Sequence, residues 1–309
     1  MNNEEYLLAK DTLLTEYEQQ SLSKYGLDHI VDKLLYHQSE LLKKNEQLES
    51  KLDEFHQDLN NANIAQANLL PKKITFTSEL DFSARFIPSQ YISGDTYNIF
   101  RLDEDHVGLY QIDVSGHGVT AALFSVSLSQ MLNVNTSHNN LLKTSLDSAP
   151  FYKINSPLHV FSLLNEERFF AKHEIFFTMV YMIINVKTGE VVYARAGHNP
   201  PVILRKNGVI DQPLGGSIPI GWDFERDDTL IKINLRKGDR IFLFSDGILE
   251  AQNVEKELFG EERLFNVLKS NLDNDLDTTL NDSIIHLSQY TGNLKFEDDI
   301  SILGVTYLG

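Results

Sequence analysis

The sequence predicts an α+β protein in which largely antiparallel β-sheet is covered by helices, preceded by a helical N-terminal segment. Three observations support this prediction. Strand-like runs outnumber helical patterns, tight turns join neighbouring runs, and the first seventy residues differ in composition from the rest. Tight turns between consecutive strands require antiparallel pairing. Helices that flank such strands are typical of a layered α+β architecture.

The N-terminal segment, residues 1–70, is predicted to be helical. It contains no proline and a single glycine, Gly26, and it is rich in Leu, Glu, Gln and Lys. We expect Gly26 to separate two helices, because glycine destabilises a helix interior. The second helix is expected to end before Pro71, since proline cannot continue a helix and disfavours helix at the preceding residue.

A seven-residue repeat of apolar residues begins at Val31 and predicts a coiled coil over residues 31–70. Asn45 occupies a core position, where asparagine fixes the register of two-stranded coiled coils. We therefore expect a homodimer formed through these helices; the alternative is an amphipathic helix packed on its own domain. The two core positions hold Leu34, Leu41, Leu48 and Phe55, and Val31, Gln38, Asn45, Leu52 and Leu59.

Residues 72–309 are expected to form one domain, whose elements are placed from hydrophobic patterns and turn signals. The stretch 133–157, rich in Asn, Ser, Thr and Pro, is expected to be a loop. The predicted strands are 74–77, 82–87, 96–101, 106–114, 176–185, 191–195, 202–205, 230–235, 240–244 and 300–307. The predicted helices are 119–132, 159–171, 261–272 and 276–290.

Composition excludes several classes of protein. The chain has no cysteine, which rules out disulfides and thiolate metal sites. No secretory signal is visible, and no apolar stretch approaches the roughly 18 residues that span a bilayer. The net charge of −17 argues against nucleic acid or an anionic membrane as the main partner. We expect a cytoplasmic protein.

Four aspartates lie where strand-like runs begin or end: Asp95, Asp113, Asp246 and Asp298. If they converge, like charges about 4 Å apart repel by several kcal/mol even at an effective dielectric near 20. Such a cluster must take up protons or bind cations. Mg²⁺ and Mn²⁺ prefer oxygen ligands. The sequence therefore predicts a divalent-metal site.

The spacing of two strands places the first pair of acids. If 96–101 and 106–114 form a hairpin that turns about Glu104, positions whose numbers sum to about 208 face each other. Asp95 and Asp113 satisfy that sum, and opposed residues have Cβ atoms roughly 5 Å apart. A cation between them would remove the repulsion. A slipped register would instead send the two acids to opposite faces.

The run Asp-Val-Ser-Gly-His-Gly that starts at Asp113 has the composition of a tight turn around a ligand. Its glycines allow main-chain carbonyls to approach a cation, so the Val114 carbonyl is a candidate ligand. Gly116 could equally serve only to supply a turn conformation. His117 has a side chain suited to proton donation, but a lone histidine in such a turn is more often structural.

Taken together, these segments resemble the bacterial metal-dependent protein phosphatases of type 2C, specifically the SpoIIE and RsbU-like serine phosphatases. The resemblance covers roughly residues 64–308, and the stretches occur in family order. They are AQANLLP (65–71), SGDTYN (93–98), DVSGHGVTAAL (113–123), FTMVY (177–181), TGEVVYARAGHNPP (188–201), GDRIFLFSDGILEAQN (238–253) and EDDISIL (297–303).

The resemblance implies two stacked antiparallel sheets flanked by helices, and a centre of two Mn²⁺ or Mg²⁺ ions. Relatives commonly read GGDFYD where this chain has SGDTYN, so Asn98 replaces an acid; this bears on a third, weaker metal rather than on the two-metal centre. Gly94, Gly116 and Asp299 match positions beside the ligands. The ligand positions match Asp95, Asp113, the Val114 carbonyl, Asp246 and Asp298.

The implied activity is hydrolysis of a phosphoserine or phosphothreonine ester by a water that two metal ions activate. The implied substrate is a phosphorylated regulator of the anti-sigma-factor antagonist type, with the N-terminal helices as input and the helix at 119–132 as the moving part. Two other functions stay open. One is a catalytically weak dimeric module that binds the same partner. The other is a two-metal nuclease or phosphodiesterase, which the acidic surface disfavours.

Overall fold

The structure is a computed structural model of the 309-residue chain. It describes residues 24–116, 118–134, 140–166, 175–222, 224–292 and 296–309. The chain divides into two compact units, Met1–Asp58 and Leu59–Gly309.

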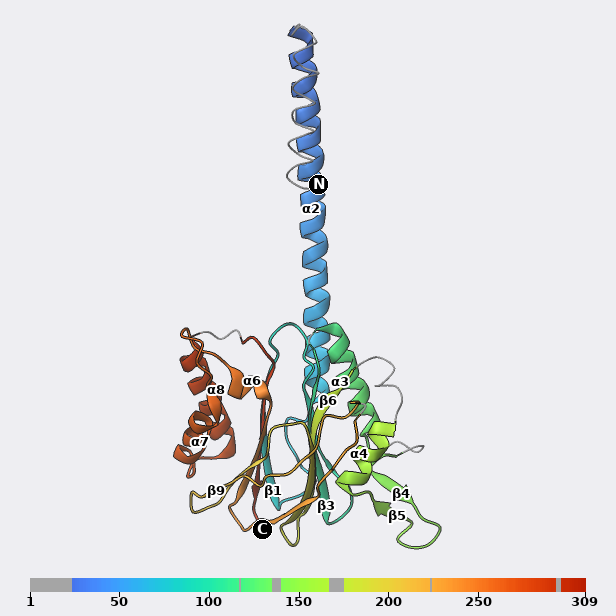
Figure 1. Cartoon of the computed structure of the whole chain (residues 1–309), viewed down its shortest axis with the longest axis vertical. Coiled ribbons are helices and arrows are strands. Elements are labelled where there is room, and N and C mark those ends of the chain that lie inside the picture. Colours follow the sequence, from blue (N-terminus) through green and yellow to red (C-terminus); the bar gives the residue numbers. More distant parts are fainter. Residues whose placement is uncertain (1–23, 117, 135–139, 167–174, 223, 293–295) are drawn as a thin grey trace. The chain divides into compact units, whose positions relative to one another are not determined.

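Helix α2 (Lys24–Leu69) contains 46 residues and continues across the boundary between the two units (Figure 1). It runs through Gly26, so the predicted break there is wrong. A glycine costs a helix about 1 kcal/mol relative to alanine, and the many good helix formers around it outweigh that loss. The helix ends two residues before Pro71, as the sequence predicted.

The second unit contains two five-stranded sheets in which every neighbouring pair is antiparallel. The first sheet has the order β10-β7-β6-β3-β2. Its strands are β2 (Thr96–Arg101), β3 (His106–Val114), β6 (Phe177–Asn185), β7 (Glu190–Ala196) and β10 (Ile231–Asn234).

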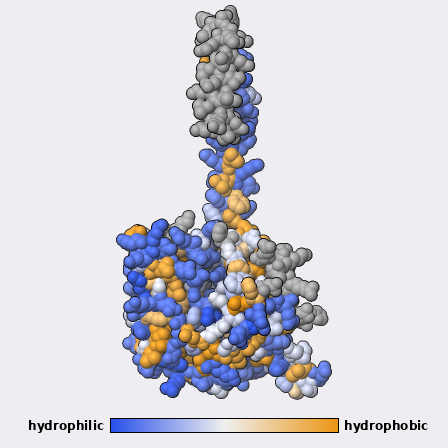
Figure 2. All heavy atoms as spheres, in the orientation of Figure 1, coloured by the Kyte–Doolittle hydropathy of each residue, from blue (hydrophilic) through white to orange (hydrophobic). Residues whose placement is uncertain are grey.

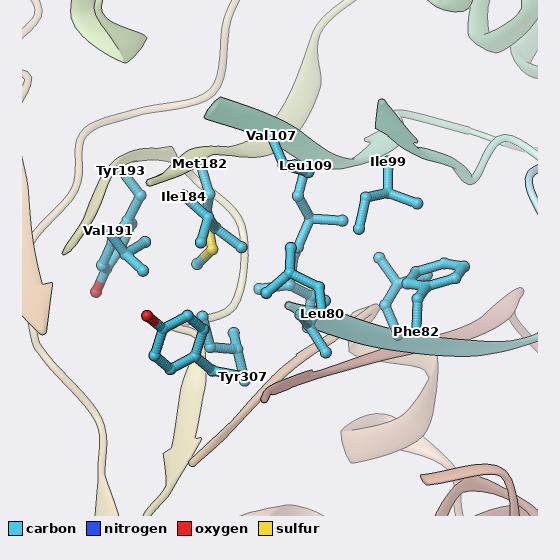
Figure 3. Close-up of a cluster of buried hydrophobic side chains, with 14 of the residues drawn as sticks. Leu80, Phe82, Ile99, Val107, Leu109, Met182, Ile184, Val191, Tyr193 and Tyr307 are labelled. Carbon is cyan, nitrogen blue, oxygen red and sulfur yellow. The ribbon is translucent and has the colours of Figure 1, made fainter. Parts of the chain in front are cut away.

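The second sheet has the order β1-β12-β11-β8-β9 and stacks on the first (Figure 1). The apolar side chains that fill the space between the sheets come from both of them, among them Leu80 and Phe82 from one and Leu109 and Met182 from the other (Figure 3). The strands of this sheet are β1 (Leu80–Ile87), β8 (Val202–Leu204), β9 (Ile210–Asp211), β11 (Arg240–Phe244) and β12 (Ile300–Tyr307).

Helices cover the outer face of each sheet (Figure 1). One buried cluster lies between α3, α4 and the first sheet, and another lies between α6, α7, α8 and the second. Because both faces of the central strands are covered, these strands read as nearly continuous apolar runs. The predicted sandwich of two antiparallel sheets between helices is confirmed. The helices are α3 (Val119–Met131), α4 (Pro157–Glu166), α6 (Asp246–Glu250), α7 (Gly260–Ser270) and α8 (Leu276–Thr291).

Two local predictions are wrong. Residues 74–77 form no strand; Ile74 and Phe76 pack, half-buried, against the core between the sheets. The expected loop at 133–157 contains a small hairpin of β4 (Lys143–Ser145) and β5 (Tyr152–Ile154). Its polar residues bond to one another: the Thr144 hydroxyl donates to the Asn155 side chain, whose amide donates to the Leu141 carbonyl.

The other predicted strands and helices agree with the structure to within one or two residues where it describes them. Residues 167–171 of the predicted helix 159–171 lie outside the described residues, and so do positions 135–139 of the predicted loop. Strand β9 was not predicted. Of the helices described, none combines the length and the apolar character needed to cross a membrane.

Candidate active site at one edge of the sandwich

The hairpin of β2 and β3 has the register that the sequence predicted. Thr96 lies opposite Ile112, so paired residue numbers sum to 208. The pairing continues past the end of β2, where the Val114 N–H donates to the Gly94 carbonyl at 3.4 Å. Asp95 and Asp113 therefore face each other, on the side of the hairpin that is turned toward the second sheet.

The other two acids come from the second sheet. Asp246 begins α6 directly after β11, and Asp298 directly precedes the turn into β12, the neighbouring antiparallel strand. A Cβ atom added to Gly247 would lie 2.3 Å from the Asp299 carbonyl oxygen. This position must be glycine for the first turn of α6 to pack this closely on residues 298–299.

The aspartates influence one another's protonation. Burial and the negative charges of Asp246 and Asp298 raise the pKa of Asp113 to about 7. Burial and the charge of Asp113 raise the pKa of Asp95 well above its usual value. Burial and the charge of Asp298 likewise raise the pKa of Asp246. The structure thus brings four carboxyl groups from both sheets into one cluster of interacting charges.

The residues suit a divalent cation in their chemistry. The candidate donors are carboxylate oxygens and a main-chain carbonyl, which match Mg²⁺ and Mn²⁺, and a cation would remove the repulsion that raises the pKa values. Gly94 leaves space at the Val114 carbonyl oxygen, which a Cβ atom would approach to 2.9 Å. As the side chains stand, no group of three or more Asp, Glu or His residues within the described ranges is close enough to hold an ion.

Asp299 holds the loop that carries Asp95. Its side chain is buried and accepts three hydrogen bonds: from the Ser89 N–H at 2.7 Å, the Ser93 hydroxyl at 2.7 Å and the Gly94 N–H at 2.9 Å. The Ser93 hydroxyl oxygen in turn accepts from the Asp95 N–H at 3.0 Å. Asp299 therefore supports the loop that carries Asp95.

Three other positions discussed from the sequence are Gly116, His117 and Asn98. Gly116 has φ +88°, the left-handed region that favours glycine, in the turn after Asp113. His117 lies outside the described residues. Asn98 lies opposite Tyr110, on the face of the first sheet that α3 covers rather than the face that carries the acids.

Several buried polar residues around the cluster were not predicted. Gln111 and Ser301, both fully buried, lie between the sheets beside Asp95. Gln66, near the end of α2, bonds to both the N–H and the carbonyl of Ser93. A single glutamine or serine inside an apolar pattern carries no signal in the sequence, because its partners lie far along the chain.

His198 is a further buried group that the sequence did not single out. Its Nδ1 lies 2.7 Å from the hydroxyl of Thr178, the residue opposite Asp113 on the neighbouring strand. Burial and the charge of Arg195 lower the pKa of His198 to about 3, so its ring is neutral at physiological pH. His198 thus packs as a neutral residue against Thr178, on the strand next to the one that carries Asp113.

Residues 103–308, more than half of the chain, match the family described as stage II sporulation protein E (SpoIIE). The chain belongs to the SpoIIE family. The resemblance drawn from the sequence is therefore confirmed.

Curated relatives of this SpoIIE-family chain include proteins of Bacillus subtilis and of a Synechocystis species. The phosphoserine phosphatase RsbU of Bacillus subtilis is 31% identical over 196 residues, which cover 62% of this chain and 52% of RsbU. Protein IcfG of a Synechocystis species is 25% identical over 256 residues, covering 78% of this chain and 40% of IcfG. The chain spans about half the length of the curated relatives it matches.

Solved structures share the fold. The SiaA-PP2C domain of Pseudomonas aeruginosa superposes with a TM-score of 0.69 at 18% identity, over 83% of this chain and 98% of that domain. A structure of the PP2C phosphatase domain and part of the regulatory domain of SpoIIE from Bacillus subtilis gives a TM-score of 0.57 at 20% identity, over 76% and 64%. The fold is therefore that of the PP2C-type phosphatase domains.

Proposed function

We propose that this chain is a metal-dependent phosphoprotein phosphatase that hydrolyses a phosphoserine or phosphothreonine ester on a regulatory protein. The observation that carries the proposal is the cluster of four aspartates, drawn from both sheets, in which burial and neighbouring negative charges raise the pKa values of Asp95, Asp113 and Asp246. Family membership supports it, since the relatives RsbU and RsbP are both named phosphoserine phosphatases.

The ligands proposed for two Mn²⁺ or Mg²⁺ ions are Asp95, Asp113 with the Val114 carbonyl, Asp246 and Asp298. Such ions, when bound, supply an activated water and offset charge on the phosphoryl oxygens. The protein's own part is to hold the acids together: Asp299 fixes the Asp95 loop through three hydrogen bonds. A phosphate ester is itself an anion, and uncompensated carboxylates would repel it.

The test is hydrolysis in the presence of Mn²⁺, first of a generic phosphate monoester and then of candidate phosphorylated antagonists. We expect Asp113→Asn and Asp246→Asn each to reduce the Mn²⁺-stimulated rate to background, because each removes a charge that a cation requires. Both variants should stay folded by circular dichroism, since an amide is nearly isosteric with a carboxyl. A wild-type rate in either variant would overturn the proposal.

We further propose that residues 1–70 form a regulatory segment, with a coiled coil at about 31–70 that makes a homodimer, and that residues 72–309 form the phosphatase domain. Six apolar heptad residues of α2 support the dimer, because their side chains are exposed. Figure 2 shows hydrophobic side chains at the surface of this helix. A second copy of the helix would bury them. Their exposed fractions are Val31 47%, Leu34 64%, Leu41 63%, Leu48 65%, Leu52 53% and Phe55 54%.

The proposed partner is a phosphorylated protein of the anti-sigma-factor antagonist type. Helix α3 is proposed to move when the N-terminal helices transmit a signal. Helix α3 starts five residues after Val114, so its displacement would shift the turn that carries Asp113. A location in the cytoplasm stays a prediction.

A second candidate is a catalytically weak dimeric module that binds the same partner. One observation favours it: within the described ranges the acids do not stand close enough to hold an ion. Turnover of a phosphate monoester with Mn²⁺ separates the two functions. A module of this kind would bind the phosphoprotein and release no phosphate.

A further inference from the structure

Gln111 occupies an unusual place in the sandwich. It lies on β3, two residues before Asp113, and it is fully buried between the two sheets. Its Oε1 atom has no hydrogen-bond partner among the described residues. Burial of an amide whose hydrogen bonds are incomplete is unfavourable, and an apolar residue would suit the sandwich better. The amide nitrogen of the same side chain, in contrast, is hydrogen-bonded.

The Gln111 amide nitrogen contacts a single residue of the opposite sheet. Nε2 lies 2.7 Å from the Ser301 hydroxyl oxygen and 3.2 Å from the Ser301 carbonyl oxygen. A carbonyl oxygen can only accept, so the atom that faces it must be the amide nitrogen rather than Oε1. The orientation of the Gln111 amide is therefore fixed by its surroundings.

The Ser301 hydroxyl also contacts Asp95, at Oδ2. A hydroxyl group has one hydrogen to donate. Because the Gln111 amide donates to Ser301 Oγ, the hydroxyl keeps its own hydrogen for its other contact and donates it to Asp95 Oδ2. The chain of donors runs in one direction, from Gln111 through Ser301 to Asp95.

The main chain of Ser301 is also held firmly. Its N–H donates to the Ser245 hydroxyl oxygen at 2.9 Å, and the Ser245 hydroxyl donates to the Asp299 carbonyl at 3.0 Å. Ser245 immediately precedes Asp246. The position of Ser301 is therefore set by the second sheet, while the direction of its hydroxyl is set by Gln111 of the first.

We propose that Gln111 is a positioning residue for the metal centre. By fixing the direction of the Ser301 hydroxyl, it orients the Asp95 carboxyl group, whose Oδ2 this hydroxyl engages, for binding a divalent cation. The inference rests on the proposed metal-dependent phosphatase and deepens it. Residues that orient the ligands of a metal typically change its affinity about ten- to a hundredfold when they are replaced.

The alternative is that Gln111 and Ser301 only join the two sheets. If so, each substitution should weaken Mn²⁺ binding only as far as it lowers thermal stability. If Gln111 positions the ligand, Mn²⁺ affinity and thermal stability should change independently across the variants. The experiment is calorimetric titration of the full chain with Mn²⁺, together with thermal unfolding in a chelator. The variants are Gln111→Met, Ser301→Ala, the double variant and Ser301→Thr. Ser283→Ala is the matched control, since Ser283 is a buried serine whose hydroxyl donates within α8.

We expect Gln111→Met and Ser301→Ala each to weaken Mn²⁺ binding by about tenfold or more. The double variant should bind no more weakly than Ser301→Ala, because Gln111 acts through Ser301. Ser301→Thr keeps the hydroxyl and adds a methyl group to a packed core, so it should lose thermal stability and keep its Mn²⁺ affinity. Ser283→Ala should change stability alone.

The other outcomes would contradict either the positioning role of Gln111 or the proposed metal centre. Additive losses in the double variant, or Mn²⁺ affinities that follow the melting temperatures across the series, would overturn the positioning role of Gln111. Equal Mn²⁺ binding by wild type and Gln111→Met would do the same while leaving the proposed phosphatase intact. If the wild type binds no Mn²⁺ at all, the proposed metal centre and this inference both fall.

Discussion

Asp113 has a carboxyl group whose pKa is raised to about 7 by burial and by the charges of neighbouring acids. Its ordinary value is 3.8, so without metal the folded protein binds a proton between about pH 4 and 7 that the unfolded chain releases. A group with a raised carboxyl pKa favours the folded state less as pH rises. A bound cation opposes this loss of stability with rising pH, because it favours the ionised form of the Asp113 carboxyl group.

We therefore expect the metal-free protein to become less stable as pH rises from about 4 to about 7, by on the order of 1–4 kcal/mol. Denaturant unfolding in a chelator across this range measures the loss. Saturating Mn²⁺ should reduce it, and Asp113→Asn should make the dependence shallower, because one of the titrating groups is gone. A stability that rises with pH over this window in the chelator would contradict the prediction.

Individual residues were predictable to different degrees. The four acids could be found because each lies at the end of a strand-like run, where side chains point to a sheet edge. Gln111, Ser301 and Gln66 could not. Each is an ordinary polar residue in its local sequence, and its function depends on a partner that is 190, 206 or 27 positions away.

At the scale of elements, α2 contacts the candidate site through Gln66. This buried side chain donates to the Ser93 carbonyl at 2.7 Å and to the Ser125 hydroxyl at 3.2 Å, and accepts from the Ser93 N–H at 3.0 Å. Ser125 lies on α3, and Ser93 lies two residues before Asp95. One side chain therefore joins the last turns of α2, the helix α3 and the loop that carries the acid.

We expect Gln66→Ala to lower the Mn²⁺-dependent rate by about tenfold, since it leaves the buried Ser93 N–H without its partner, at about 1–3 kcal/mol. The Ser93 carbonyl would keep only the longer bond from the Ser125 hydroxyl at 3.4 Å. Phosphate release from a small monoester measures this rate. Gln57→Ala is the control, because Gln57 is an exposed glutamine on the same helix. Equal rates for the two variants would show that the contact does not reach the site.

Elements were predicted well where local pattern and tertiary packing agree. The hairpin of β2 and β3 was predicted with its register, because its turn is short and one face is buried. The hairpin of β4 and β5 was missed, since its strands are only three residues long and lie in a stretch rich in Asn, Ser, Thr and Pro. Residues 74–77 have a strand-like composition, yet they pack on the core without a partner strand. Strand formation depends on a neighbour as well as on composition.

At the scale of the whole molecule, the proposed dimer is the feature that the heptad repeat predicts. We expect the full chain to sediment as a dimer and Leu48→Asp to shift it toward monomer, because a buried charge disfavours the seam. Gln47→Asp places the same charge at an exposed position outside the seam and should leave the dimer intact. Analytical ultracentrifugation distinguishes these outcomes. A monomeric wild type would exclude the coiled-coil dimer.

The sequence by itself determined most of the longer strands and helices, the register of the first hairpin, the heptad repeat and the positions of the acids along the chain. These features depend on the alternation, spacing and turn chemistry of neighbouring residues. Only the tertiary structure decided how the two sheets stack and therefore which side chains meet between them. The bond from Ser93 to Asp299 spans 206 positions; such contacts arise from the packing of layers, and no local pattern specifies them.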